Sequence, residues 1–144
     1  MKSLVASLIR LFEQTPYWLV ALLGRFAIAV VFWKSGRSKV DGWNIFTVND
    51  KTAFLFQEEY KVPLLPPELS ALMAQIAEHV LPVLLILGLA TRFSALGLLV
   101  MTVVIQVFVY PNAYALHASW AAILLMLIKY GPGMVSLDHW LSRR

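Results

Sequence analysis

Four long apolar runs, separated by short polar turns and one long connection, dominate the pattern along the chain. A helix needs about 20 residues to cross the hydrocarbon core of a bilayer, because each residue adds about 1.5 Å. The pattern predicts membrane-spanning helices at about residues 17–36, 69–90, 93–110 and 114–129. The expected fold class is therefore all-α: an integral membrane four-helix bundle whose consecutive spans are antiparallel.

The segments between and beside these runs have patterns of their own. Residues 3–14 are amphipathic with a helical period, which predicts a helix lying in the membrane interface. The connection 40–68 is long for a helical bundle and rich in aromatic residues, so it is expected to fold over one mouth of the bundle, with a short helix near 52–60. Residues 134–144 predict an amphipathic tail, and residues 1–144 make one domain.

Composition supports the membrane assignment and excludes several kinds of chemistry. Hydrophobic residues make up 60% of the 144 positions and charged residues only 14%, whereas soluble domains are about 25% charged. The chain contains no cysteine, which excludes disulfides, thiolate redox chemistry and cysteine-bound iron–sulfur clusters. The net charge of +4 fits basic loops facing anionic lipid better than it fits nucleic acid.

The distribution of charges predicts an orientation. One side of the predicted bundle holds two carboxylates against a larger basic set, namely Lys2, Arg10, Arg92, Lys129, Arg143 and Arg144. The other side holds five carboxylates against four basic residues: Arg37, Lys39, Lys51 and Lys61. Because basic loops stay on the cytoplasmic side, we expect both termini in the cytoplasm and the long loop outside.

The second predicted span contains a polar stripe, formed at the spacing i, i+3, i+4 and i+7 by Gln75, Glu78, His79 and Pro82. A carboxylate near the middle of a span costs roughly 2.5–3.5 kcal/mol or more to bury alone. Proline lacks the N–H that would bond the carbonyl of Glu78. The stripe therefore predicts a paired or functional carboxyl group in the interior of the bundle.

The first predicted span offers a partner for this carboxyl group. Its own stripe comprises Arg25, Phe32, Gly36 and Lys39. One interpretation is structural, an ion pair between Arg25 and Glu78 that joins two helices. The other is functional, with Glu78 relaying protons or binding a polar headgroup. The two interpretations are compatible.

Other polar side chains in the spans are candidates for the same chamber. His79 can carry protons near neutral pH, and His117 follows in the fourth span. The two histidines could also ligate a metal or haem, but a pair without a further motif predicts no metal site. Gln106 is expected to bond Glu78 or His79 across helices. Lys39 and Arg37 are either interfacial residues or part of a funnel for an anionic substrate.

An ordered set of short motifs resembles the DoxX family. These are Arg25, Phe32, Ser35-Gly36 and Lys39, then Glu78, Gly88-Leu89-Ala90-Thr91-Arg92, Phe108-Val109-Tyr110-Pro111 with His117 and Trp120, and Gly131-Pro132-Gly133-Met134-Val135-Ser136-Leu137-Asp138. The resemblance extends from Leu22 over nearly the whole chain and implies a four-span protein of the bacterial inner membrane. It also implies links to quinone-coupled sulfur oxidation, oxidative-stress complexes or operons for metal-binding modified peptides.

Together these observations predict the membrane subunit of an oxidoreductase system, with no intrinsic cofactor and with a quinone or similar apolar redox molecule in an outward-facing polar chamber. The expected catalytic residues are Glu78, His79 and His117, and the expected cofactor-binding residues are Arg25, Lys39, Gln106 and Arg37. The expected partners are the lipid bilayer and an oxidoreductase or metallopeptide-processing protein, with a homo-oligomer left open. The alternatives are a non-catalytic anchor or assembly partner and, more weakly, a metal handler or small-solute transporter.

Overall fold

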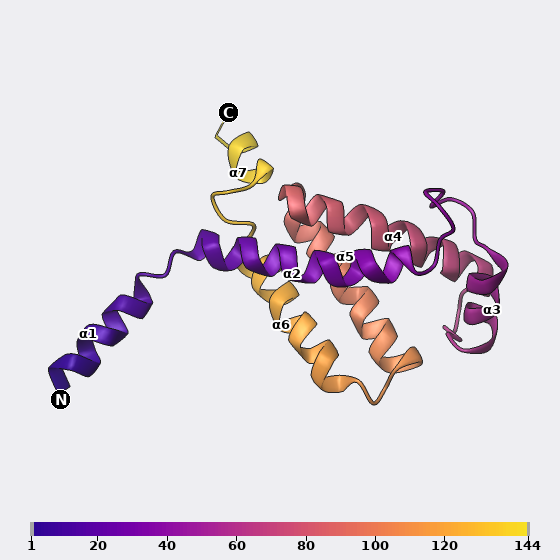
Figure 1. The fold of residues 1–144 in the computed structure, drawn as a ribbon, viewed down its shortest axis with the longest axis horizontal. Helices are drawn as coiled ribbons and strands as arrows, with labels where there is room; N and C mark the ends of the chain where they lie inside the picture. The colour runs from indigo at the N-terminus through magenta and orange to yellow at the C-terminus, as the bar shows by residue number, and fades with distance from the viewer. Residues whose placement is uncertain (1, 144) are drawn as a thin grey trace.

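A computed structural model describes residues 2–143. Helices are the only regular elements in this part of the chain, and Figure 1 shows their order. They are α1 (Lys2–Glu13), α2 (Tyr17–Arg37), α3 (Asp50–Glu58), α4 (Pro67–Leu87), α5 (Thr91–Val104), the π-helix η1 (Ile105–Val109), α6 (Tyr114–Tyr130) and α7 (Leu137–Leu141).

The predicted all-α membrane bundle is confirmed. Within residues 2–143, α2, α4 and the continuous helix α5–η1 are long and apolar enough to cross a membrane, and α6 is a shorter apolar helix of 17 residues. Helix α4 starts two residues before the predicted span and ends earlier, because Gly88 takes a left-handed conformation with φ 67°. Glycine adopts this conformation without strain and commonly ends helices.

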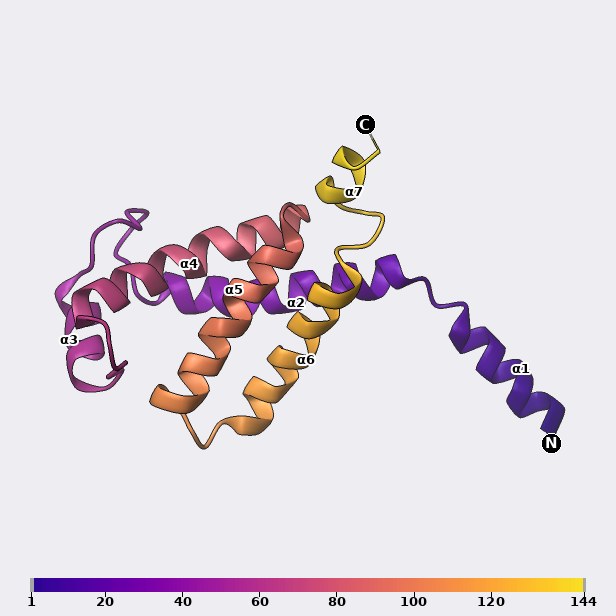
Figure 2. The same ribbon diagram turned by 180° about the vertical axis from the view of Figure 1, so that it is seen from behind.

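The bundle is made of two antiparallel helix pairs. Helix α2 packs along α4, and α5 packs along α6, while α4–α5 and α2–α6 contacts join the pairs. Figures 1 and 2 show the α5–α6 hairpin running obliquely across α2 and α4. Alanines, aliphatic side chains and one phenylalanine make up the buried core cluster: Ala21, Ile28, Ala29, Phe32, Leu85, Ala95, Leu98, Leu124 and Leu127.

The outer faces of the same helices expose apolar side chains. Examples are Leu23, Phe26, Val83, Phe93 and Val103. A water-soluble bundle would place polar residues there, so this surface fits a surrounding of lipid.

The polar stripe of α4 faces inward, as the sequence predicts. Gln75, Glu78, His79 and Pro82 are all buried. Helix α2 comes very close here, because a Cβ on Gly36 would lie 2.9 Å from a ring carbon of His79 and 3.0 Å from Cβ of Glu78. Only glycine permits this approach, so Gly36 determines the level along the two helices at which α2 and α4 come closest.

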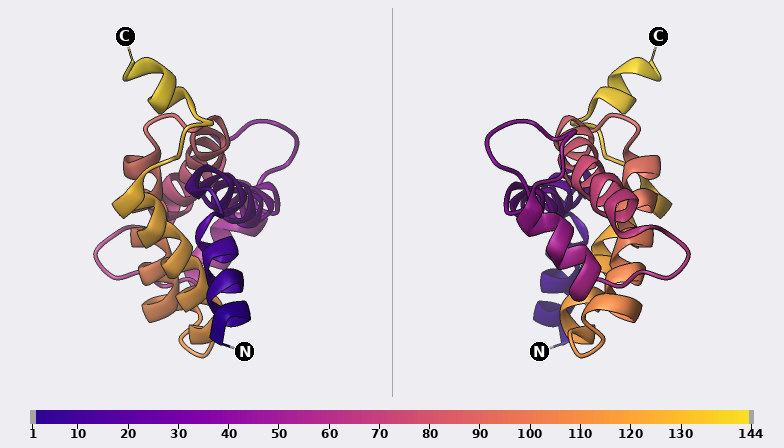
Figure 3. Two further views of the ribbon diagram at one scale, coloured as in Figure 1. Left: turned by 90° about the vertical axis from the view of Figure 1, so that its left-hand side faces the viewer. Right: turned by 90° about the vertical axis from the view of Figure 1, so that its right-hand side faces the viewer.

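The long connection folds against one end of the bundle. Its helix α3 begins at Asp50 rather than at the predicted Thr52, because the Asn49 side chain accepts a hydrogen bond from the Thr52 backbone N–H and caps the helix. Helix α3 packs on α4, and Figure 3 shows it from the side. The Thr52 hydroxyl also donates to the carbonyl oxygen of Lys39 at 2.7 Å, which fixes α3 to the end of α2.

The two terminal helices lie outside this bundle. Helix α1 extends away from it, as Figure 1 shows, and its apolar side chains from Leu4 to Phe12 are exposed. Its predicted location in the membrane interface stays a prediction. Helix α7 begins at Leu137 and is capped by Ser136, whose hydroxyl accepts a hydrogen bond from the backbone N–H of His139. Arg144, which contributes to the predicted charge asymmetry, lies outside the described residues.

Candidate functional site

A cavity of about 540 Å³ lies between the α2–α4 pair and the α5–α6 hairpin, with the long connection contributing to its wall. Most of its lining is apolar. The apolar residues include Val31, Phe32, Phe56, Met73, Ala77, Leu81, Val100, Met101, Val104, Leu116 and Trp120. Its size falls within the range of small-molecule sites, about 300–1,000 Å³. The predicted polar chamber is thus a largely apolar one with polar groups at a few places.

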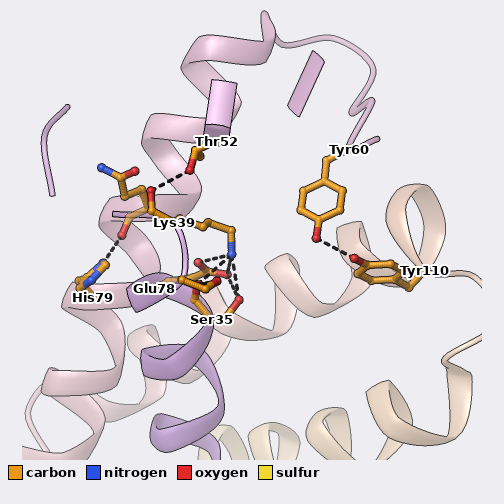
Figure 4. Close-up of polar contacts among 9 residues, drawn as sticks. Ser35, Lys39, Thr52, Tyr60, Glu78, His79 and Tyr110 are labelled. Atoms are coloured by element: carbon orange, nitrogen blue, oxygen red, sulfur yellow. Dashed lines mark hydrogen bonds and ion pairs between the residues drawn. The ribbon is translucent and has the colours of Figure 1, made fainter. Parts of the chain in front are cut away.

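A buried ion pair forms the main polar feature of this cavity. The Lys39 ammonium lies 2.8 Å from one oxygen of Glu78 and 3.1 Å from the other, and the exposed fractions of the two side chains are 8% and 3%. The Ser35 hydroxyl donates to Glu78 at 2.9 Å and accepts from Lys39 at 2.9 Å, as Figure 4 shows. Each charge is therefore paired and hydrogen-bonded, as burial in a low dielectric requires.

The predicted pair between Arg25 and Glu78 is wrong. Arg25 lies about 16 Å along α2 from Gly36, the residue that contacts Glu78, given a rise of 1.5 Å per residue. In the antiparallel pair this places Arg25 beside the far end of α4. Its guanidinium donates instead to backbone carbonyl oxygens of Leu85, Ile86 and Val135.

Arg25 does not line the cavity, so the structure does not bring this predicted cofactor-binding residue to the chamber. It belongs to a separate cluster at the opposite end of the bundle. There the Asp138 carboxylate accepts hydrogen bonds from the backbone N–H groups of Ala90 and Thr91, at 2.7 and 2.9 Å. These contacts hold the tail against the α4–α5 turn.

His117 lines the cavity from α6 and is 4% exposed. Its Nδ1 lies 2.7 Å from Oε1 of Gln106, and the ring lies 5.0 Å from that of Trp120, centroid to centroid. Gln106 therefore does bond across helices, but its partner is His117 and not the predicted Glu78 or His79. Gln106 lies in the π-helix η1, and π-helical turns of this kind are frequent at functional sites.

His79 and Arg37 are near the lining residues Glu78 and Lys39 in the sequence, but they do not line the cavity themselves. His79 donates from Nδ1 to the Gln75 carbonyl oxygen at 2.7 Å, and its ring lies edge-on to Trp33. Arg37 donates to the Gly42 carbonyl oxygen at 2.6 Å and covers the ring of Trp43. Both side chains are thus held by local contacts outside the chamber.

Two tyrosines that the sequence did not single out as site residues line the same cavity. The hydroxyl groups of Tyr60 and Tyr110 lie 2.7 Å apart and link the long connection to the end of η1 (Figure 4). Burial, followed by the hydrogen bond with Tyr110, raises the pKa of Tyr60 above its ordinary value, so this phenol stays neutral at physiological pH. The aromatic richness of the connection was the available signal.

The apolar outer surface, the antiparallel spans and the interior ion pair define a small multi-span membrane protein. The DoxX family matches residues 20–111, and the chain belongs to this family. It is also similar to an uncharacterized protein of Haemophilus influenzae, with 34% identity over 134 aligned residues that cover 85% of this chain and 83% of that protein. No solved structure matches the chain.

Proposed function

We propose that the cavity binds a quinone, or a similar apolar ring with polar substituents, and that the protein is the membrane component of an oxidoreductase system. The observation that supports this most is the combination of an apolar cavity of about 540 Å³ with a buried Lys39–Glu78 pair and a histidine in its wall. An apolar ring gains by burial in such a site, and its few polar atoms need matching partners.

Different residues at the cavity wall would interact with different parts of such a ligand. Lys39 holds positive charge where a ligand carbonyl oxygen would lie, and its longest hydrogen bond, 3.2 Å to the Ser35 carbonyl oxygen, is the one that such a ligand would replace. Glu78 and His117 are the groups that hold or accept protons at the wall. Phe32 and Trp120, whose ring centroids lie 5.5 Å apart with their planes at 59°, supply an apolar aromatic wall. A bound quinone would supply the electron-transfer chemistry that these side chains lack.

Trp120 provides an optical test of this proposal. We expect a short-chain benzoquinone, added to the protein in lipid nanodiscs, to quench tryptophan fluorescence saturably, because Trp120 lines the cavity. Trp120→Phe should remove the saturable part and leave the other four tryptophans. Ala77→Phe, which fills part of the cavity, should weaken binding at least about tenfold, equivalent to about 1.4 kcal/mol.

The matched control is Ala122→Phe, which adds the same ring to an exposed position of α6 away from the cavity. It should bind the quinone as the parent protein does. Quenching that never saturates, or that is the same in Ala77→Phe and the parent, would reject a quinone site in this cavity.

We further propose that the protein lies in the bacterial inner membrane with both termini in the cytoplasm, which the charge asymmetry supports. The absence of cysteine from the sequence makes a labelling test direct. In intact spheroplasts, a membrane-impermeant maleimide should label Glu58→Cys in α3, and should label Ser142→Cys in the tail only after permeabilisation. The reverse pattern would invert the orientation.

A further inference from the structure

The hydrogen bonds around His117 determine which of its ring nitrogens carries the proton. Gln106 donates from its amide nitrogen to the carbonyl oxygen of Pro111 at 2.7 Å, and a carbonyl oxygen can only accept. This contact fixes the orientation of the amide, so its Oε1 is the atom that faces His117. An amide oxygen also only accepts, and therefore Nδ1 of His117 must carry the proton.

The other ring nitrogen of His117 is consequently an acceptor. In the neutral imidazole, Nε2 has a lone pair and no hydrogen. Within residues 2–143, Nε2 has no hydrogen-bond partner. The hydrogen bond of this side chain is the one from Nδ1 to Gln106, and its ring contact is with Trp120. Since Nδ1 faces Gln106 and the ring lines the cavity, the Nε2 edge is the one left for a ligand.

Two of the polar groups that line the cavity, Lys39 and His117, are therefore of opposite kind. Lys39 is a donor with a positive charge, whereas His117 presents an acceptor. A quinone carries only carbonyl acceptors, and it leaves Nε2 unpaired once water is excluded. A hydroxyl on the ring pairs with it, and an unpaired buried acceptor costs free energy.

We infer that His117 is a specificity-determining residue that selects ligands with a ring hydroxyl, that is, a hydroquinone or another phenol, over the quinone or an ether. Gln106 is its positioning residue, because it fixes the tautomer. This inference rests on the proposed function and deepens it, since it states which form of the ring the cavity retains.

The test compares ligands that differ only in the donor. In nanodiscs at pH 8, where an imidazole is ordinarily neutral, the affinities of 4-hexylphenol and its methyl ether are measured by Trp120 quenching competition against the benzoquinone. We expect the parent protein to prefer the phenol by about 3- to 10-fold, the range that one neutral hydrogen bond gives. An anaerobic comparison of the matched hydroquinone and quinone should show the same direction.

Variants then assign the preference to His117. His117→Phe should bring the ratio of phenol to ether affinity to about one, and Gln106→Leu should reduce it, because the tautomer is no longer fixed. Comparing ratios between variants cancels the different partitioning of the two ligands into lipid. Ser119→Ala, an exposed α6 position away from the cavity, should keep the parent ratio.

The outcomes separate this inference from the proposal on which it rests. Saturable quinone binding without any preference for the hydroxyl form would overturn the role of His117 and leave the quinone site standing. A preference that persists in both His117→Phe and Gln106→Leu would overturn it too. No saturable binding of either ring form would overturn both.

Discussion

Replacement of Glu78 by alanine is expected to lower the free energy of unfolding by about 3–5 kcal/mol, the usual cost of removing one partner of a buried ion pair. The cost arises because the Lys39 ammonium stays buried at the cavity wall and loses its two contacts with the carboxylate, at 2.8 and 3.1 Å. Ser35 alone cannot compensate for that charge. Thermal or chemical unfolding in detergent micelles, followed by circular dichroism, measures the loss.

The control for this prediction removes both charges together. Lys39→Met combined with Glu78→Leu should restore most of the lost stability, because no charge is left unpaired and the volumes are similar. His117→Ala should cost less than Glu78→Ala, since it leaves no charge behind. Equal loss in these two single variants, or no recovery in the double variant, would contradict a buried pair of this kind.

The ion pair has a consequence for the site as well as for stability. Lys39 and Glu78 neutralise each other at the cavity wall, so the protein can keep charged groups beside an apolar ligand without exposing a bare charge to the membrane interior. The same pair also ties the end of α2 to the middle of α4. Ligand affinity and thermal stability are therefore expected to change together in Glu78 variants, and less so in His117 variants.

The spans and the buried stripe of α4 were predictable from the sequence because both depend on local periodicity. The length of a span can be read directly from the run of apolar residues. Glu78 shares a helix face with Gln75 and His79 wherever the neighbouring helix lies. The same holds for α2, whose stripe from Arg25 to Lys39 is buried as its spacing predicts.

The pairing between helices was not predictable in this way. It depends on the relative shift of α2 and α4, which the close approach at Gly36 determines. This shift places Lys39 opposite Glu78, although Lys39 follows the last helical residue and a lysine there is usually an interfacial one. The bond between Gln106 and His117 likewise depends on the π-helical end of α5, for which the sequence has no periodic signal.

The second large effect is expected at Arg25, which the structure assigns to the packing of the tail and not to the cavity. Arg25→Leu removes the donor shared by the carbonyl oxygens of Leu85, Ile86 and Val135. Hydrogen bonds to a charged group contribute about 1.5–3 kcal/mol each, and two of these three are long, so we expect a loss of about 3 kcal/mol. Hydrogen exchange should also show loss of protection in α7 and at the α4–α5 turn.

A second variant separates this role from a general loss of stability. Asp138→Asn weakens the other contact of the tail, in which the carboxylate accepts hydrogen bonds from the backbone N–H groups of Ala90 and Thr91. It should reduce hydrogen-exchange protection in α7 and at the α4–α5 turn, as Arg25→Leu does, while quinone binding is retained. Arg10→Leu, at an exposed position of α1, removes a charge of the same kind and should change stability by no more than about 0.5 kcal/mol. If Arg25→Leu instead abolished quinone binding with the tail still protected, Arg25 would have to act on the chamber. Its distance along α2 from Gly36, about 16 Å at 1.5 Å per residue, argues against that.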